Sequence, residues 1–406
     1  MPRRRVPRPS ELRPYLRTGP IHLWPIERRL AAAATIWDLR SAARRRVPRA
    51  VFDYTDGAAE TETSLQRSRD SFKRVEFVPR VLRDVSSVDL STTILGRLSA
   101  MPLVFAPTGF TRLMHAEGEP SVGRVAARMG IPYALSTLGT TSPEDLSAAL
   151  PGADLWFQLY IWNDREAVLE LVRRARTAGF RVLVLTVDTP VAGARLRDVH
   201  NGFTIPPTLS LRTLIDIGLH PGWWFDKLTT EPLQFAVFTE TGGTVADLIN
   251  RVFDPTITIA DLSWIREAWD GPIVIKGIQT VDDARAVVDA GADGIIVSNH
   301  GGRQLDRAPT PLEQLPAIAA AVGDRAEVFV DGGIMSGADV IAAVAMGARA
   351  ALVGRAYLYG LMAGGERGVE RAGELLRKEA VRTMQLLGVA SVAELGPERV
   401  RLRSAP

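Results

Sequence analysis

The 406-residue sequence contains no cysteine. Disulfides, thiolate nucleophiles and cysteine-based zinc sites are therefore excluded, and we expect no metal site. No apolar run reaches the roughly 18 residues that a membrane-spanning helix needs. The best candidate, Ile341–Leu352, is short and interrupted by Arg349. With 46% hydrophobic and 23% charged residues, the composition is that of a globular protein with a sizeable core.

Lysine is scarce, and the excess of basic charge is confined to the first residues of the chain. Residues 1–30 hold eight arginines and only two acidic residues, whereas the whole chain has a net charge of +3. A nucleic-acid-binding protein more often carries a basic face on its folded domain, so we expect no nucleic-acid partner. We interpret residues 1–34 as a basic arm that is either solvated or in contact with anionic lipid or a neighbouring subunit. The arm lacks the apolar region of a secretory signal. We therefore expect a cytoplasmic protein, with peripheral contact to the inner face of the cell membrane as an option.

From about residue 100, short apolar runs alternate with helical stretches, which is typical of βαβ units and a parallel sheet. Eight runs in one series fit a closed (β/α)8 TIM barrel better than an open sheet, so the fold class is α/β. Residues 35–406 then form a single domain, whose N-terminal helical extension comprises helices over 35–46 and 49–64. The eight runs are Leu103–Ala106, Tyr133–Leu135, Leu155–Leu159, Val182–Val187, Ile273–Ile275, Gly294–Val297, Val328–Val330 and Ala351–Val353.

One connection is much longer than the others. About 85 residues separate Val187 from Ile273, after the fourth strand. Loops of this length are usually lids, binding loops or mobile segments. We interpret residues 200–262 as an insertion that forms a lid or docks an electron acceptor, with a decorative insertion as the alternative.

Polar or titratable residues follow every one of the eight runs. In a barrel of this kind, chemistry is built at the carboxyl ends of the strands. These side chains should therefore surround one site. They are Pro107, Thr108, Gly109, Ser136, Gln158, Tyr160, Thr186, Asp188, Lys276, Ser298, Asn299, His300, Asp331, Gly332, Gly333, Gly354 and Arg355.

The ends of the last two strands predict a phosphate pocket. Gly332 and Gly333 let backbone approach an anion closely, and a helix opening near Ser336 offers free N–H groups and a favourable dipole. Arg355 adds a fork of charge-assisted donors.

His300 is the best candidate for a catalytic base. Arg303 lies three residues further on, so one loop could present a base beside a carboxylate clamp. Asp188, at the end of the fourth strand, could orient the imidazole and stabilise its protonated form. Lys276 ends the fifth strand and suits either a Schiff base or a cation beside an electron-accepting ring. The phosphate pocket favours the second role.

The segment Ser298-Asn-His-Gly-Gly-Arg-Gln-Leu-Asp306 resembles the signature of FMN-dependent 2-hydroxy acid oxidising enzymes, which include glycolate oxidase, lactate oxidase and lactate monooxygenase. Phe157–Tyr160, Thr186–Pro190 and Arg195–Asp198 are similar to further blocks of that family, as are Asp331–Gly333 and Val353–Arg355. The similarity runs from about residue 35 to 390. Pro221-Gly-Trp-Trp and Tyr357–Leu361 most resemble bacterial respiratory L-lactate dehydrogenases.

This resemblance implies a role for each matching residue. His300, paired with Asp188, would accept a substrate proton while two electrons pass to FMN, as a hydride or through a carbanion. Lys276 would stabilise negative charge on the flavin. Tyr54, Tyr160, Arg195 and Arg303 would hold the substrate, and Tyr160 would also take part in catalysis. The flavin would contact Pro107, Thr108, Gly109, Ser136, Gln158, Thr186, Ser298 and Asp331, and its phosphate would contact the backbone at Gly332, Gly333, Gly354 and Arg355.

Three positions depart from the family pattern. Met335 stands where the family usually has an arginine, so one expected phosphate contact is missing. Leu138 and Gly109 replace a frequent tryptophan and the usual alanine beside the flavin. Both changes alter the space over the ring and argue against a simple glycolate oxidase.

The resemblance implies oxidation of an L-2-hydroxy acid, L-lactate above all, to the 2-oxo acid, with electrons passed to a quinone or another carrier. The alternatives are an oxidase or lactate 2-monooxygenase that uses oxygen, a flavin-binding module without turnover, and a flavoenzyme that modifies a peptide-derived cofactor precursor. By analogy with the family we expect a homo-oligomer, a tetramer.

Overall fold

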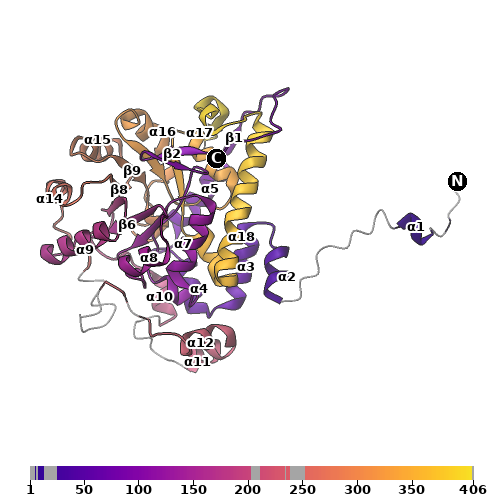
Figure 1. Ribbon diagram of the computed structural model, residues 1–406, viewed down its shortest axis with the longest axis horizontal. Helices are drawn as coiled ribbons and strands as arrows, with labels where there is room; N and C mark the ends of the chain where they lie inside the picture. Colours follow the sequence, from indigo (N-terminus) through magenta and orange to yellow (C-terminus); the bar gives the residue numbers. More distant parts are fainter. Residues whose placement is uncertain are drawn as a thin grey trace.

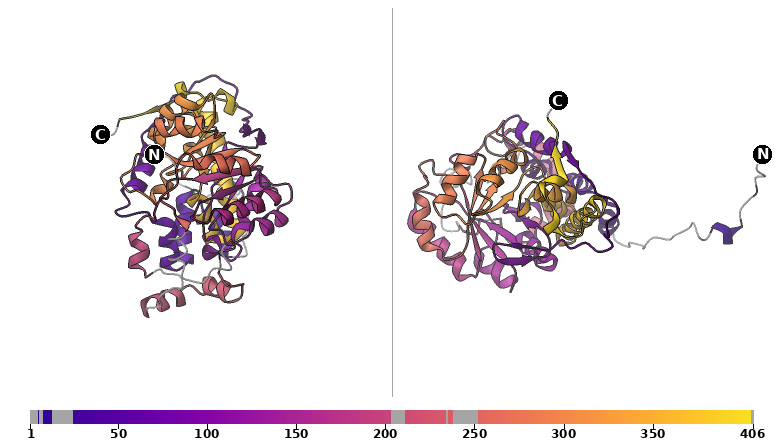
Figure 2. Two further views of the ribbon diagram at one scale, coloured as in Figure 1. Left: turned by 90° about the vertical axis from the view of Figure 1, so that its left-hand side faces the viewer. Right: turned by 90° about the horizontal axis from the view of Figure 1, so that it is seen from above.

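The computed structural model describes residues 5, 8–12, 25–202, 211–233, 235–237 and 252–404. Its centre is a closed barrel of eight parallel strands surrounded by helices (Figures 1 and 2). The strands follow one another around the barrel in chain order, and the last strand pairs with the first. The predicted (β/α)8 barrel is confirmed. Its strands are β4 Leu103–Phe105, β5 Tyr133–Ser136, β6 Leu155–Leu159, β7 Val182–Thr186, β8 Ile273–Ile278, β9 Gly294–Val297, β10 Glu327–Val330 and β11 Ala350–Val353.

Burial on both faces explains why each strand is a continuous apolar run. Parallel strands that are covered by helices outside and by side chains inside have no solvent face. Alternate residues accordingly belong to two separate apolar clusters, one outside and one inside the barrel. In the inner cluster the rings of Trp156 and Phe329 meet edge to face, with centroids 5.8 Å apart.

A short hairpin closes the amino-terminal end of the barrel. It consists of β2 (Thr92–Ile94) and β3 (Arg97–Ser99), and Ile94 is buried in the inner cluster. The guanidinium of Arg181 donates to the carbonyl oxygens of Ile94 and Leu95 and holds the hairpin in place. The opposite end, where the strands finish, is left for the site. A second small sheet pairs β1 (Val75–Phe77) with β12 (Val400–Leu402).

Helices between the strands form the outer ring. The longest, α18, is bent where Gly364 and Gly365 leave helical backbone angles. The helices are α6 Thr111–Met114, α7 Gly118–Met129, α8 Pro143–Ala149, α9 Arg165–Thr177, α14 Asp261–Ala268, α15 Val281–Asp289, α16 Pro311–Val322, α17 Gly337–Ala345 and α18 Arg355–Leu387, with 3-10 turns at His300–Gly302, Val392–Glu394 and Pro397–Arg399.

The N-terminal extension differs from the prediction at one point. The helix expected over 35–46 is present as α3 (Ile36–Arg46), capped by the side chain of Thr35. The helix expected over 49–64, with a turn at Gly57, is shorter than predicted: α4 (Arg49–Asp56) does end at Gly57, but the chain does not return to helix until α5 (Thr63–Lys73). The intervening backbone bonds to distant loops instead, since Ala59 N donates to Gly302 O and Glu60 N donates to Ala194 O.

Part of the predicted arm is helical. α2 (Pro25–Ala32) lies beside α18, and Arg367 of α18 pairs with Glu27. α1 (Pro9–Leu12) lies away from the barrel (Figure 1). The boundary near residue 34 between the arm and the domain stays a prediction.

The long connection after β7 carries helices α10 (Leu196–His200), α11 (Leu211–Gly218) and α12 (Pro221–Leu228). In Figure 1, α11 and α12 lie below the body, on the side of α4 and α10 and away from β2. Trp223 Nε1 donates to Leu113 O at 2.9 Å, so α12 is attached to α6, the short helix that follows β4. Residues 203–210 and 238–251 of the predicted insertion lie outside the described residues. Among the helices that are described, none is long and apolar enough to cross a membrane.

Candidate functional site

A cavity of about 390 Å³ opens at the carboxyl ends of the barrel strands, and every one of the eight strand ends contributes to its wall. Three predicted residues do not line the cavity: Asp188 and Ser298 stand behind the wall and contact residues that line it, and Asn299 is buried and donates to Ser68. The predicted residues that line the cavity are Tyr54, Pro107, Thr108, Gly109, Ser136, Gln158, Tyr160, Thr186, Arg195, Lys276, His300, Arg303, Asp331, Gly332, Gly333, Gly354 and Arg355.

His300 and Asp188 form a hydrogen-bonded pair at this cavity. Nδ1 of His300 lies 2.9 Å from Oδ1 of Asp188, so the other ring nitrogen is left for the cavity. Burial would raise the pKa of Asp188, but His300 and then Lys276 outweigh burial and lower it. His300 has a positive φ of 56°, a conformation that is uncommon outside glycine and is often found at functional sites. The arrangement suits a base held by a carboxylate.

Lys276 is buried with its charge compensated. Its Nζ lies 3.0 Å from Oδ2 of Asp331 and donates to Oγ of Ser298 at 2.9 Å. Burial alone would lower the pKa of Lys276, but the carboxylates of Asp331 and Asp188 outweigh it and raise the pKa. The ammonium therefore stays charged, which does not suit a Schiff-base nucleophile, because such a nucleophile must be a free amine.

A chain of polar side chains links three neighbouring strand ends. Ser136 Oγ donates to Gln158 Oε1 at 3.0 Å, and Gln158 Nε2 donates to Thr186 Oγ1 at 3.1 Å. At the next strand, Thr108 Oγ1 lies 2.7 Å from the hydroxyl of Tyr357. These contacts fix the orientation of groups that face the cavity from β4 to β7.

Two arginines gather around Tyr54 at the cavity mouth. The guanidinium carbons of Arg303 and Arg195 lie 5.1 and 5.7 Å from the centroid of the Tyr54 ring. Burial, and next the positive charge of Arg195, lower the pKa of Arg303 to about 10. The nearest carboxylate to Arg195 that forms an ion pair, Asp198, is 3.9 Å away, and burial raises its pKa. An anion between the two guanidinium groups would relieve their repulsion.

Tyr160 lies on the same side of the cavity. Its side chain is buried and its ring meets Phe253 edge to face, with centroids 5.4 Å apart. Burial, and then the charge of Asp188, raise the pKa of Tyr160, so its hydroxyl keeps its proton and can donate to a bound oxyanion.

The predicted phosphate pocket is only partly as expected. The amides of Gly332 and Gly333 make no hydrogen bond within the described part of the chain. The opening of α17, however, is partly occupied, because Met335 N donates to Asp339 and Gly337 N donates to Glu379, each at 2.8 Å. Those two carboxylates already serve as the anions for this helix end, and Glu379 belongs to the distant helix α18.

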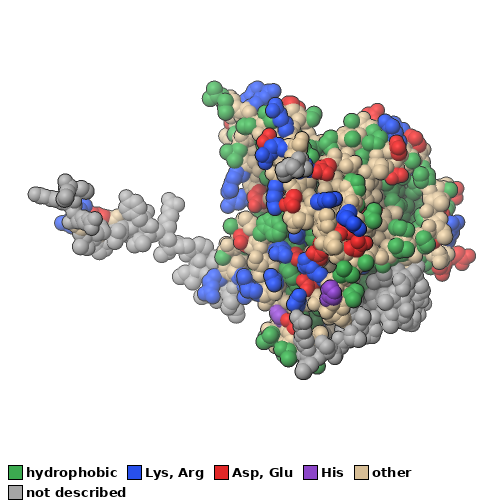
Figure 3. All heavy atoms as spheres, turned by 180° about the vertical axis from the view of Figure 1, so that it is seen from behind, with side chains coloured by type: hydrophobic (Ala, Val, Ile, Leu, Met, Phe, Trp, Pro, Cys, Tyr) green, Lys and Arg blue, Asp and Glu red, His purple; other side chains and the backbone are tan. Residues whose placement is uncertain are grey.

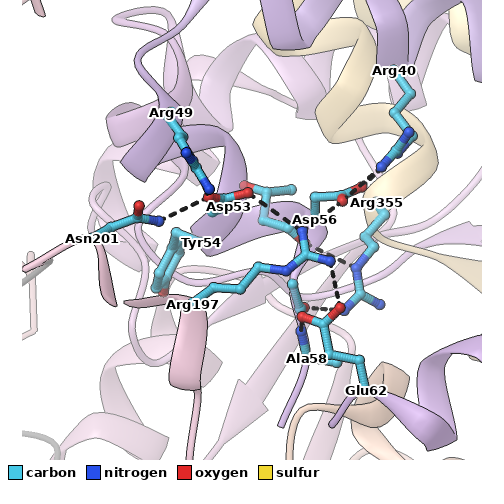
Figure 4. A network of polar contacts seen from close by, with 12 residues as sticks. Arg40, Arg49, Asp53, Tyr54, Asp56, Ala58, Glu62, Arg197, Asn201 and Arg355 are labelled. Carbon is cyan, nitrogen blue, oxygen red and sulfur yellow. Dashed lines mark hydrogen bonds and ion pairs between the residues drawn. The ribbon is translucent and has the colours of Figure 1, made fainter. Parts of the chain in front are cut away.

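The side chain of Arg355 is also committed, contrary to the expectation that its fork faces an anion. It donates to the carbonyl oxygens of Thr55, Gly57 and Gly301 at 2.9, 2.7 and 2.9 Å. Figure 4 shows it beside the ion-pair network around Asp56. Arg355 thus ties the loop between α4 and α5 to the loop after β9, and three of its five N–H donors are used in doing so.

Several residues that line the cavity were not predicted as site residues. Phe235 and Phe253 come from the long connection, and Phe235 packs against Phe110 with centroids 4.7 Å apart. Arg69 reaches the cavity from α5. The apolar patch around Phe235 was visible in the sequence, but no local pattern distinguishes Arg69 from Arg67, the other arginine of α5.

Comparison with known proteins agrees with this architecture. The model of the family described as FMN-dependent dehydrogenase matches residues 43–402. A Mycobacterium tuberculosis protein, provisionally named L-lactate dehydrogenase, is 57% identical over 397 residues, which are 98% of this chain and 96% of the relative. An L-lactate dehydrogenase of Caulobacter vibrioides is 44% identical over 365 residues, 88% of this chain and 95% of the relative.

Solved structures are similar too. The crystal structure of a monotopic membrane protein, (S)-mandelate dehydrogenase, superposes with a TM-score of 0.88 and 38% identity, covering 92% of this chain and 100% of that one. A mandelate oxidase superposes with a TM-score of 0.80 and 42% identity, covering 92% and 99%. The order of motifs, the barrel and these similarities lead to one conclusion: the chain belongs to the FMN-dependent dehydrogenase family.

Proposed function

We propose that the protein oxidises L-lactate, or a closely related L-2-hydroxy acid, to the 2-oxo acid and passes the electrons to a quinone or another carrier. The observation that carries the proposal is the placement of the His300–Asp188 pair in one cavity with Arg195 and Arg303. A base and two cations facing one space suit a substrate that has both an ionisable hydroxyl and a carboxylate.

The residues at the strand ends fit FMN. Oδ1 of Asp331 is buried without a hydrogen-bond partner, which suits a hydroxyl of the ribityl chain. The ammonium of Lys276 suits the negative charge of a reduced flavin ring, and the backbone at Gly332 and Gly333 suits a phosphate. When bound, FMN would accept the two electrons of the substrate.

The chain's own residues then bind the acid and move its proton. We assign the substrate carboxylate to Arg195 and Arg303, with Tyr54 and Tyr160 beside it. Nε2 of His300 accepts the hydroxyl proton, and Asp188 stabilises the resulting imidazolium. The hydroxyl of Tyr160 keeps its proton and can donate a hydrogen bond to an oxygen of the bound acid.

The side chain of the acid is the part of the proposal on which the relatives differ, because their names include both lactate and mandelate enzymes. Leu138, Phe235 and Phe253 supply an apolar wall to the cavity. We expect L-lactate to reduce the enzyme-bound flavin under anaerobic conditions, and a panel of L-2-hydroxy acids of rising chain length tests this. Absence of bleaching with every acid of the panel would refute the proposal.

We assign the acceptor side to the long connection. The tip formed by α11 and α12 exposes hydrophobic side chains, which gather at the lower end of the molecule in Figure 3. They are Leu214, Ile215, Leu219, Phe225 and Leu228, between 49% and 75% exposed. Apolar side chains at a projecting tip suit the boundary between lipid headgroups and acyl chains, where a quinone is reached.

Vesicle sedimentation tests this contact. Replacing Leu219 and Leu228 by serine should reduce cosedimentation with anionic vesicles and slow reoxidation by a membrane quinone, without slowing flavin reduction by L-lactate. Stopped-flow reoxidation of the reduced flavin separates the oxygen-using alternative. The reduced flavin of an oxidase would be reoxidised faster by air than by a quinone analogue. Light scattering tests the expected tetramer.

A further inference from the structure

Helix α5, which lies outside the barrel repeat, closes the end of the cavity to which we assign the phosphate of FMN. Helix α5 lies directly against the end of β10: a Cβ atom built on Gly333 would be 2.3 Å from Ser68 O and 3.2 Å from Arg69 N. The side chain of Arg69 lines the main cavity and also a second cavity of about 500 Å³, and Gly333 and Met335 line both as well. Arg69 therefore stands at the boundary of the two, beside the unbonded glycine amides.

Most of the other donors at this end are already used. The opening of α17 is occupied by Asp339 and Glu379. The guanidinium of Arg355 is bound to three carbonyl oxygens. Met335, which lines the cavity where an arginine would reach the phosphate, is apolar. A phosphate here would have backbone amides but no cation from the loop after β10, and the guanidinium of Arg355 after β11 is held mainly by carbonyl oxygens.

The positive charge of Arg69 is only partly compensated by its neighbours. Its Nη2 lies 3.3 Å from the hydroxyl of Tyr359 and 3.9 Å from Oδ1 of Asp56, and its guanidinium carbon lies 5.2 Å from the centroid of the Trp37 ring. Asp56 cannot neutralise it fully, because Arg40 already holds both carboxylate oxygens at 2.6 and 2.8 Å and Arg197 lies 3.1 Å away (Figure 4).

The surroundings of Arg69 strengthen this argument. Its side chain is only 12% exposed, so water screens its charge poorly. A guanidinium has five N–H donors, and Tyr359 accepts only one of them. A largely dehydrated cation with unused donors, next to glycine backbone, is the complement of a phosphate.

We propose that Arg69 of α5 supplies the cationic side-chain contact to the phosphate of FMN, in the place left by Met335. The proposal rests on the assignment of FMN to this cavity. It makes the N-terminal extension part of the cofactor site, and it explains how the chain tolerates methionine at position 335.

The test compares FMN with riboflavin, which has the same ring and ribityl chain but no phosphate. Full-length protein is stripped of flavin and titrated with each compound by flavin fluorescence. Because a hydrogen bond to a charged group contributes about 1.5–3 kcal/mol, Arg69→Met should weaken FMN binding by about 10- to 150-fold. Riboflavin binding should not change, Arg69→Lys should retain part of the FMN affinity, and added salt should weaken FMN binding less in Arg69→Met than in the parent.

Two further variants control for damage to the fold. Arg67→Met removes an exposed arginine from the same helix and should leave both affinities unchanged. The double variant Arg69→Met with Met335→Arg moves the cation to the other wall and should restore FMN affinity.

Equal weakening of FMN and riboflavin by Arg69→Met, or no weakening of either, would overturn the assignment of Arg69. A parent protein that binds neither flavin would contradict the FMN site itself, so the two failures are distinguishable.

Discussion

Replacement of Asp188 by asparagine isolates the role of the carboxylate behind His300. Oδ1 of Asp188 lies 2.9 Å from Nδ1 of His300, in a side chain that is only 8% exposed. Loss of a hydrogen bond to a charged partner costs about 1.5–3 kcal/mol, which corresponds to about a 10- to 150-fold slower step. The rate falls by up to about 10⁴-fold if the asparagine turns its NH₂ toward the His300 ring, because the imidazole is then held in the tautomer that cannot accept the substrate proton at Nε2. Such a turn is possible because Oδ2 of Asp188 has no hydrogen-bond partner.

Anaerobic stopped-flow reduction of the FMN-loaded variant by L-lactate measures the effect. The rate at saturating lactate should fall, whereas the lactate concentration that gives half the maximal rate should change little, because Asp188 stands behind the cavity wall. Asp164→Asn makes the same chemical change at the exposed N-cap of α9 and should have no effect. An Asp188→Asn protein with full FMN content and an unchanged reduction rate would refute the assignment of this pair.

Three further predictions concern the surrounding charges. Arg303→Lys keeps the charge but loses the fork, so it should raise the half-saturating lactate concentration about 10-fold in the same assay; an unchanged value would remove Arg303 from the carboxylate site. Asp56→Ala should lower the free energy of unfolding by about 3 kcal/mol in urea titrations, because it removes a buried carboxylate and leaves the half-buried Arg40 without its partner; a loss below 1 kcal/mol would contradict this. Burial raises the pKa of Asp339 to about 6 from 3.8, so its contribution to stability is present below pH 4 and lost as the pH rises through about 6. As the pH rises between those values, Asp339→Asn should therefore gain stability relative to the parent, by up to about 3 kcal/mol, and a stability difference that does not vary with pH would contradict this.

The barrel was predictable because its signal is local. Each strand is buried on both faces and contains a short apolar run, as in Val182–Leu185. Parallel strands in a barrel end at the same rim, so residues as distant in sequence as Ser136 and His300 had to meet there.

The errors arose where one element meets another that is remote in sequence. The blocked amide of Gly337 depends on Glu379, which is 42 residues away on α18. The committed guanidinium of Arg355 depends on carbonyls near residues 55 to 57, about 300 positions earlier. Arg69 was missed for the same reason, since its place beside Gly333 is set by the packing of α5 and not by any motif.

Replacement of His300 by glutamine tests the central claim most directly. Glutamine keeps a polar side chain of similar length but cannot accept the substrate proton. Removal of a general base slows its step by about 10²- to 10⁴-fold. We predict that the variant retains FMN and binds lactate, but that its flavin bleaches at least 100-fold more slowly under anaerobic conditions, in line with that range. Bleaching at the parent rate would show that proton removal does not depend on His300 and would contradict the account.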